Sequence, residues 1–190
     1  MNAEQILKDA EALLTGHFLY ASGRHGDKYF QCAKMQQYPD KMESLAKMTA
    51  ESLKGVKAEY VLSPAIGGIV FGYELARQVG AKAVFTEREN GKMTLRRSFE
   101  LPKGAKVIIA EDVITTAGTV KEVMEVAKEN GADIVAVGVI VDRSGGKHGL
   151  DVPVHAALTS DVVSYAAEEC PLCKKGIPVE KPGSRTSAAK

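Results

Sequence analysis

The chain lacks the features that mark membrane, secreted and nucleic-acid-binding proteins. Its 25 lysines and arginines balance 24 aspartates and glutamates, so no global field attracts nucleic acid or an anionic membrane. No apolar run approaches the roughly 20 residues of a membrane span, and the N-terminus lacks the apolar block of a signal peptide. Three cysteines argue against a disulfide framework. We therefore expect a cytoplasmic protein without nucleic-acid or membrane partners.

Two common phosphate-binding motifs are also missing, because neither G-x-x-x-x-G-K-[ST] nor G-x-G-x-x-G occurs. What is present is an alternation of apolar β-rich runs with amphipathic helical stripes. It predicts an α/β fold with a mainly parallel sheet, whose ligands bind beyond the carboxyl ends of the strands. The patterns predict helices at 2–14, 39–55, 69–79, 120–131 and 162–168, and strands at 18–20, 29–32, 60–62, 83–86, 93–97, 107–110, 134–142 and 154–158.

The segment 107–119 is the most informative stretch. A run typical of a doubly buried strand, 107–110, is followed by the carboxylates Glu111 and Asp112 and by a turn that opens a helix. Free backbone N–H groups and the helix dipole at such a turn favour a phosphate. The carboxylates would repel a phosphate, but they suit the hydroxyls of a ribose or a divalent cation. The pattern predicts a sugar-phosphate site, the alternative being an ordinary strand–turn–helix. Three threonines add hydroxyl donors: Thr115, Thr116 and Thr119.

Three more loops should meet at the same edge of the sheet. The loop 63–68 ends in Gly67 and Gly68, which let backbone N–H groups approach a diphosphate or simply permit a tight turn. The segment 87–97 is a predicted hairpin centred on Asn90-Gly91. It can cover a polyanion, although a charged hairpin can also be merely solvated; its four cations are Arg88, Lys92, Arg96 and Arg97.

The fourth loop, 142–149, begins with Arg143 at a strand end. An arginine there can grip a carboxylate with two parallel hydrogen bonds, or it can pair with a neighbouring acid. All four loops together predict one site at which several anionic or hydroxylated groups of a small molecule are held.

The acidic pair and the turn after it resemble the signature of the type I phosphoribosyltransferases, which bind 5-phosphoribosyl 1-diphosphate (PRPP). The resemblance implies that Glu111 and Asp112 hold the ribose hydroxyls. It also implies that the residues after them cradle the 5-phosphate: Val113, Ile114, Thr115, Thr116, Ala117, Gly118 and Thr119.

Other segments narrow the resemblance to the orotate phosphoribosyltransferase family: Gly16–Gln31, Glu87–Arg97, and the C-terminal motifs Cys-Pro-Leu-Cys-Lys-Lys-Gly and Lys-Pro-Gly-Ser-Arg185. This resemblance implies transfer of a phosphoribosyl group from PRPP to orotate in pyrimidine biosynthesis, with Mg²⁺ carried mainly by the diphosphate and no metal ligand from the protein. The residues that it implies for orotate are Tyr29, Phe30, Thr115 and Arg143.

The family's architecture implies a single domain, 1–190, with a small hood (1–38), a core sheet with flanking helices (56–168) and a tail (169–190). It implies a homodimer in which the lid loop 87–97 acts in the other subunit. Where the better-known branch of the family has two lysines, this chain has Ala21 and Gly67. Diphosphate binding should therefore rest more on backbone amides of Gly67 and Gly68 and on Arg88 and Lys92. Lys28 is a less favoured candidate to compensate for Ala21. The catalytic residues implied are Lys92, Arg88, Asp112 and Glu111.

Two other functions stay open. A purine phosphoribosyltransferase would need an apolar base pocket in place of Arg143, and a PRPP-sensing regulator would usually add a DNA-binding domain.

Cysteine and histidine offer a weaker signal. Cys170-x-x-Cys173 has the shape of half a zinc knuckle, and a dimer could unite two such pairs, with Cys32 as a further ligand. We expect reduced, unligated thiols instead. The four histidines, His17, His25, His148 and His155, show no metal-binding spacing and are expected to be surface residues. Of these, His25 and His148 are predicted in loops and could reach substrate.

Overall fold

The computed structural model describes residues 2–20 and 22–182. Its main layer is a six-stranded sheet in the order β5-β4-β3-β6-β7-β8, parallel except for the β4–β5 pair. The strands are β3 (Tyr60–Pro64), β4 (Lys82–Glu89), β5 (Lys92–Leu95), β6 (Lys106–Ile114), β7 (Asp133–Asp142) and β8 (Val154–Thr159). The predicted mainly parallel α/β sheet is therefore confirmed.

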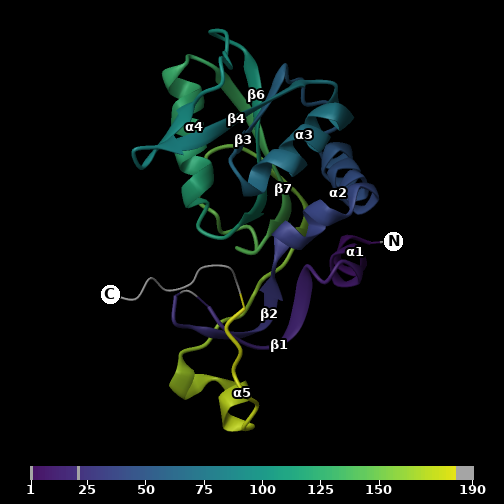
Figure 1. The fold of residues 1–190 in the computed structure, drawn as a ribbon, viewed down its shortest axis with the longest axis vertical. Helices are drawn as coiled ribbons and strands as arrows, with labels where there is room; N and C mark the ends of the chain where they lie inside the picture. The colour runs from purple at the N-terminus through teal and green to yellow at the C-terminus, as the bar shows by residue number, and fades with distance from the viewer. Residues whose placement is uncertain (1, 21, 183–190) are drawn as a thin grey trace.

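Three helices cover the two faces of this sheet (Figure 1). Helices α2 (Pro39–Ser52) and α3 (Gly67–Val79) pack against one face, and α4 (Gly118–Glu129) packs against the other. Strand β6 shows why both faces are apolar. Ile108 and Ala110 belong to the α2–α3 core, whereas Val107 and Ile109 belong to the α4 core, and all four are fully buried. Successive strand residues point to opposite faces, so a continuous apolar run serves both layers.

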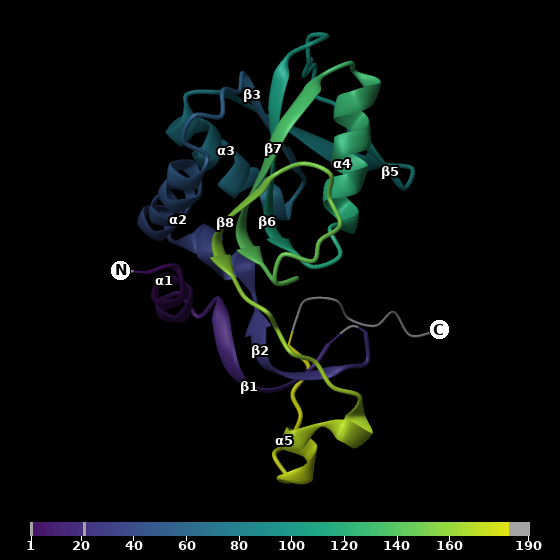
Figure 2. The same ribbon diagram turned by 180° about the vertical axis from the view of Figure 1, so that it is seen from behind.

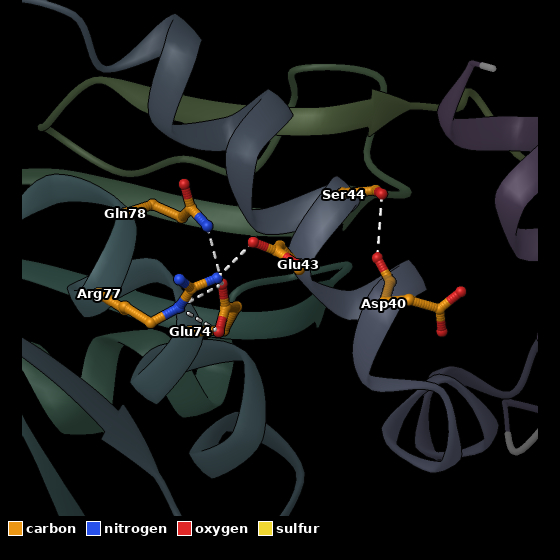
Figure 3. Close-up of polar contacts among 6 residues, drawn as sticks. All are labelled: Asp40, Glu43, Ser44, Glu74, Arg77 and Gln78. Carbon is orange, nitrogen blue, oxygen red and sulfur yellow. Dashed lines mark hydrogen bonds and ion pairs between the residues drawn. The ribbon is translucent and has the colours of Figure 1, made fainter.

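An exposed ion-pair cluster lies between α2 and α3 (Figure 3). Arg77 donates to Glu74 on its own helix at 2.7 Å and to Glu43 on α2 at 2.6 Å. Gln78 also donates to Glu74 at 2.8 Å, and Ser44 donates to the carbonyl of Asp40 at 2.9 Å. Such exposed pairs contribute little, about 0–1 kcal/mol, so burial of apolar side chains dominates the contact of these helices.

A smaller unit lies beyond the carboxyl ends of β7 and β8, as Figure 2 shows, and its buried side chains join the core of α2 and α3. It contains α1 (Ala3–Asp9) and the antiparallel hairpin of β1 (Leu13–Leu19) and β2 (His25–Phe30), followed by a 3-10 segment, Cys32–Gln37. Because it lies within the segment 1–38 predicted as the hood, we call this unit the hood.

The C-terminal segment flanks both edges of the β1–β2 hairpin. Tyr165 and His25 exchange two backbone hydrogen bonds of 2.8 Å, and Glu180 is bonded to the backbone of His17 and Leu19 at 2.7 and 2.8 Å. Between these contacts lie a short 3-10 turn, Ala167–Glu169, and α5, Pro171–Lys174. Each edge of the hairpin is thereby bonded to the C-terminal segment at one point.

Several predicted elements near the termini are wrong. The helix predicted at 2–14 ends at Asp9, and its last apolar residues belong to β1. The strands predicted at 18–20 and 29–32 instead cover 13–19 and 25–30. No α-helix covers 162–168 in the described chain: Tyr165 bonds to β2 instead, and only residues 167 and 168 are helical, in the 3-10 turn Ala167–Glu169. The apolar spacing at 162–168 therefore did not indicate a helix, because this segment packs against another part of the chain.

In the core, the corrections are smaller. Strands β3 and β6 extend to Pro64 and Ile114, further than predicted, and α3 and α4 begin two residues earlier, at Gly67 and Gly118. Ala21 and residues 183–190, including the end of the predicted tail, lie outside the described residues. No helix in the described part of the chain is long and apolar enough to cross a membrane.

Candidate active site

The acidic pair lies at the end of β6, facing the amino end of α3. A Cβ atom on Gly67 would lie 3.4 Å from a carboxylate oxygen of Asp112, and one on Gly68 would lie 3.2 Å from a carboxylate oxygen of Glu111. Glu111 accepts a hydrogen bond from the backbone N–H of Asp112 at 3.1 Å, and Asp112 accepts one from Val113 at 2.8 Å. The structure therefore unites two predicted parts of the site, the acids and the glycine loop.

Burial perturbs both carboxyl groups. It raises the pKa of Glu111 to about 9, and the neighbouring Asp112 carboxylate adds to the shift. Burial also raises the pKa of Asp112. Two carboxyls in one poorly solvated place resist ionising together, so the pair favours a ligand that supplies hydroxyl donors or positive charge.

The turn after β6 presents its polar groups to solvent. Ala117 has a left-handed conformation, φ 56°, and is the N-cap of α4. Four residues of the turn and first helical turn are exposed: Thr115, Thr116, Gly118 and Thr119. Their hydroxyls and the unpaired N–H groups of a helix start form the kind of cradle that binds phosphate. The Ile114 side chain is in the core, so only its backbone can contribute to such a cradle; its carbonyl accepts from the N–H of Arg143 at 2.9 Å.

Arg143 follows β7 and points toward the hood. Its guanidinium lies 5.3 Å from the centre of the Tyr20 ring and 5.6 Å from that of Phe30. The neighbouring acid, Asp142, does not hold it, since Asp142 accepts hydrogen bonds from Ser144 and from the backbone of Gly146. The Nε of Arg143 is buried and has no hydrogen-bond partner among the described residues. An unpaired buried donor on a charged group is costly, and a bound carboxylate would satisfy it.

The hood supplies one predicted aromatic residue and one that sequence reasoning missed. Phe30 lies beside Arg143, but Tyr29, its neighbour on β2, packs against Phe18 with tilted rings, 5.8 Å between ring centres. Adjacent strand residues point to opposite faces, so the two cannot share one partner. Tyr20 takes the second place beside Arg143, and its hydroxyl donates to the carbonyl of Lys28 at 2.6 Å. Burial raises the pKa of Tyr20. In the sequence, the only sign that Tyr20 could lie beside Arg143 was its position in an aromatic segment.

The predicted hairpin forms between β4 and β5, and its turn residues Asn90 and Gly91 have φ of 50° and 83°, as an Asn-Gly turn requires. In this conformation the arginines of the hairpin are paired with acids: Arg88 with Glu122 of α4, Arg96 with Glu89, and Arg97 with Glu87. The structure therefore does not bring Arg88 to the acidic pair.

Lys92 lines a hollow of about 570 Å³ between the hairpin and α4. The same hollow is lined by Glu122, Glu125 and Glu129. Three carboxylates make it unsuited to a polyanion, so we do not regard this hollow as the substrate site.

Comparison with known proteins agrees with this geometry. The phosphoribosyl transferase domain family matches residues 33–154. The orotate phosphoribosyltransferase of Caldicellulosiruptor saccharolyticus is 51% identical over 97% of this chain and 98% of its own, and that of Thermotoga maritima is 48% identical over 96% and 97%. The chain is thus a phosphoribosyltransferase by fold and site. Within that class, it belongs to the orotate phosphoribosyltransferase family.

Solved structures show how widely the fold is shared. Orotate phosphoribosyltransferase from Aeropyrum pernix superposes with a TM-score of 0.71 at 24% identity, covering 84% of this chain and 93% of its own. Adenine phosphoribosyltransferase from Thermoanaerobacter pseudethanolicus reaches 0.64 at 17% identity, covering 80% and 99%. Because both orotate and adenine enzymes share it, the fold alone does not identify the base, which depends on the residues of the site.

Proposed function

We propose that this protein transfers the 5-phosphoribosyl group of PRPP to N1 of orotate, producing orotidine 5′-phosphate and diphosphate. The observation that carries the choice of base is Arg143, which lies between Tyr20 and Phe30 and whose buried Nε has no partner in the part of the chain that the structure describes. The flat aromatic rings suit a pyrimidine, and the guanidinium suits its carboxylate. A purine base carries no carboxylate and would leave this charge unpaired, so the site disfavours the purine alternative.

The remaining groups would then hold PRPP. Glu111 and Asp112 accept hydrogen bonds from the ribose hydroxyls, and the turn 115–119 binds the 5-phosphate through backbone N–H and threonine hydroxyl groups. The diphosphate lies against the backbone of Gly67 and Gly68. A Cβ atom at Gly68 would lie 3.2 Å from a carboxylate oxygen of Glu111 and 2.8 Å from the Pro64 ring. The reaction develops positive charge on the ribose ring. Carboxylates fixed beside that ring stabilise this charge without reorganisation.

Mg²⁺ fits this arrangement. Carboxylate oxygens are the ligands that Mg²⁺ prefers, and positive charge would relieve the burial of the Glu111 and Asp112 carboxylates. When bound, the ion would neutralise diphosphate charge, with Glu111 and Asp112 as the nearby protein groups. The protein's own residues orient the two substrates and exclude water from the reacting carbon.

The hairpin 87–97 is the proposed lid. For Arg88 to reach the diphosphate, its ion pair with Glu122 must open, and this exposed pair costs only about 0–1 kcal/mol to break. Lys92 would neutralise the leaving group. A homodimer in which the lid serves the neighbouring subunit, and a cytoplasmic location, belong to the same proposal.

A screen of bases with PRPP and Mg²⁺, following diphosphate release, tests the function. We expect turnover with orotate and none with adenine, guanine, hypoxanthine or uracil. Uracil is the sharpest comparison because it differs from orotate only in lacking the carboxylate. Comparable turnover with uracil or a purine would contradict the proposal, and PRPP binding without turnover of any base would favour a regulator.

A further inference from the structure

Four potential metal ligands from the two ends of the chain meet beside the hood. They are His17 on β1, His25 on β2, and Cys170 and Cys173 at α5, and their ligand atoms all lie within 4.8 Å of one another. The first three are buried, while Cys173 is exposed. The expectation of surface histidines is therefore wrong for His17 and His25. Cys32, considered as a further ligand, is absent from the group.

The hydrogen bonds of His17 prepare it for a metal. Its Nδ1 lies 2.7 Å from the carbonyl oxygen of Ile177. A carbonyl can only accept, so Nδ1 carries the proton and Nε2 has a free lone pair. That lone pair faces the rest of the cluster, with Nδ1 of His25 at 2.8 Å and the sulfurs of Cys170 and Cys173 at 3.5 and 3.7 Å. Metal-bound histidines usually donate their other N–H to a carbonyl or carboxylate in this way.

The spacing of the atoms matches a tetrahedral zinc site. Zn–N bonds of about 2.0 Å and Zn–S bonds of about 2.3 Å place neighbouring N and S ligand atoms roughly 3.5 Å apart. The three N···S distances recorded here are 3.3, 3.5 and 3.7 Å. The two ring nitrogens, 2.8 Å apart, would have to separate by about half an ångström, because two Zn–N bonds place them roughly 3.3 Å apart.

We propose that His17, His25, Cys170 and Cys173 bind one structural Zn²⁺ ion within a single chain. Two thiolates and two imidazoles in tetrahedral arrangement are a donor set typical of zinc. Four protein ligands leave no open position, so the site is structural rather than catalytic. Exposure of Cys173 provides the path by which the ion enters.

The ion would fix the C-terminal segment to the β1–β2 hairpin. Without it, the segment is attached at this place by the backbone bonds of Tyr165 and Glu180 and by the side-chain contacts of Arg24 with Ser164. The hairpin leads directly to Tyr20 and carries Phe30, the two rings beside Arg143. The ion is thus expected to stabilise the hood over the proposed base pocket. This last consequence rests on the proposed function, whereas the metal site itself does not.

Metal analysis of the purified protein tests the site directly. Protein prepared in reducing, chelator-free buffer, and reconstituted with Zn²⁺, should contain about one zinc per chain by mass spectrometry. Replacement by Co²⁺ should give the visible spectrum of a tetrahedral thiolate complex. Much less than one zinc per chain after reconstitution would overturn the proposal. So would one zinc per two chains, which would indicate a site formed by Cys170-x-x-Cys173 pairs from two subunits.

Variants separate the site from general effects on folding. Cys173→Ser should lose the zinc, and because Cys173 is exposed its substitution leaves the core intact. Cys32→Ala is the control and should retain it. A chelator should lower the Tm of the wild type and of the Cys32→Ala variant by several degrees, but should not change that of Cys173→Ser. Retention of zinc by Cys173→Ser would contradict the assignment. These results do not depend on orotate turnover, so they stand or fall separately from the proposed function.

Discussion

Gly68 lies so close to Glu111 that it leaves no room for a side chain. A Cβ atom on Gly68 would lie 3.2 Å from Oε1 of Glu111 and only 2.8 Å from Cδ of Pro64. The amino end of α3 can approach the acidic pair of β6 only because this position carries no side chain. The contact brings the loop proposed for diphosphate and the carboxylates proposed for ribose into one site.

Gly68→Ala should therefore lower both stability and activity. The added methyl group must displace Pro64, a rigid ring, so we expect a loss of about 1–3 kcal/mol in the free energy of unfolding. Gly67→Ala is the matched control for stability, because its nearest neighbour is an Asp112 carboxylate oxygen at 3.4 Å, an ordinary contact. Denaturant unfolding of both variants checks this expectation, and equal stabilities would show that the Gly68 contact is not tight.

Arg143→Gln should weaken orotate binding selectively. Loss of a charge-assisted hydrogen bond predicts a rise in the KM for orotate of roughly 10- to 100-fold, with a much smaller change in the KM for PRPP. Arg77→Gln, an exposed arginine on α3, is the control (Figure 3). Steady-state kinetics with each substrate varied in turn measure the effect. An unchanged KM for orotate would refute the role of Arg143.

Asp112→Asn should raise the KM for PRPP and lower kcat while the fold persists. An amide group accepts hydrogen bonds less strongly than a carboxylate and offers one oxygen in place of two. Kinetics with a melting curve on the same preparation separate binding from stability. If both kinetic constants match the wild type, Asp112 does not hold the ribose.

Glu111 should make the ligand-free protein less stable as pH rises. Its pKa in the folded state, about 9, is above the ordinary value of 4.5, so the folded protein binds more protons than the unfolded chain between these values. Any stability from the protonated group is present below about pH 4.5 and is lost as pH rises toward 9. Glu111→Gln should therefore raise the Tm above pH 7, by about 2–4 °C per kcal/mol relieved. Near pH 4.5 the difference should vanish. Glu51→Gln, on the exposed surface of α2, serves as control, and a parallel pH profile of Glu111→Gln and wild type would contradict the expectation.

Lys92→Ala should lower kcat sharply and leave orotate binding and the Tm nearly unchanged, because an exposed charge contributes little to folding. Lys54→Ala, at an exposed position after α2, is the control. If the lid acts in the neighbouring subunit, mixing Lys92→Ala with Asp112→Asn should restore roughly a quarter of wild-type activity, because half of randomly mixed dimers contain one intact site. Failure of the mixture to exceed its parents, with subunit exchange demonstrated, would place Lys92 in its own chain or outside catalysis.

The sequence by itself determined the core sheet and the local chemistry of the acidic pair. Both depend on neighbours in the chain: a doubly apolar run makes β6 a buried strand, and the turn that follows must lie at its carboxyl end. The Asn90-Gly91 hairpin was predictable for the same reason, since its backbone conformation depends on those two residues.

The tertiary structure decided what distant segments do together. Tyr20 rather than Tyr29 lies beside Arg143, because strand alternation and the path of the hairpin set which ring faces the pocket. Residues 162–168 form no α-helix, because Tyr165 pairs with His25 on β2 and only residues 167 and 168 join a 3-10 turn. His17 and Cys170 are separated by 153 positions and meet only when the tail packs on the hood. The spacing of residues along the sequence could not predict this contact, because it depends on packing between the two ends of the chain.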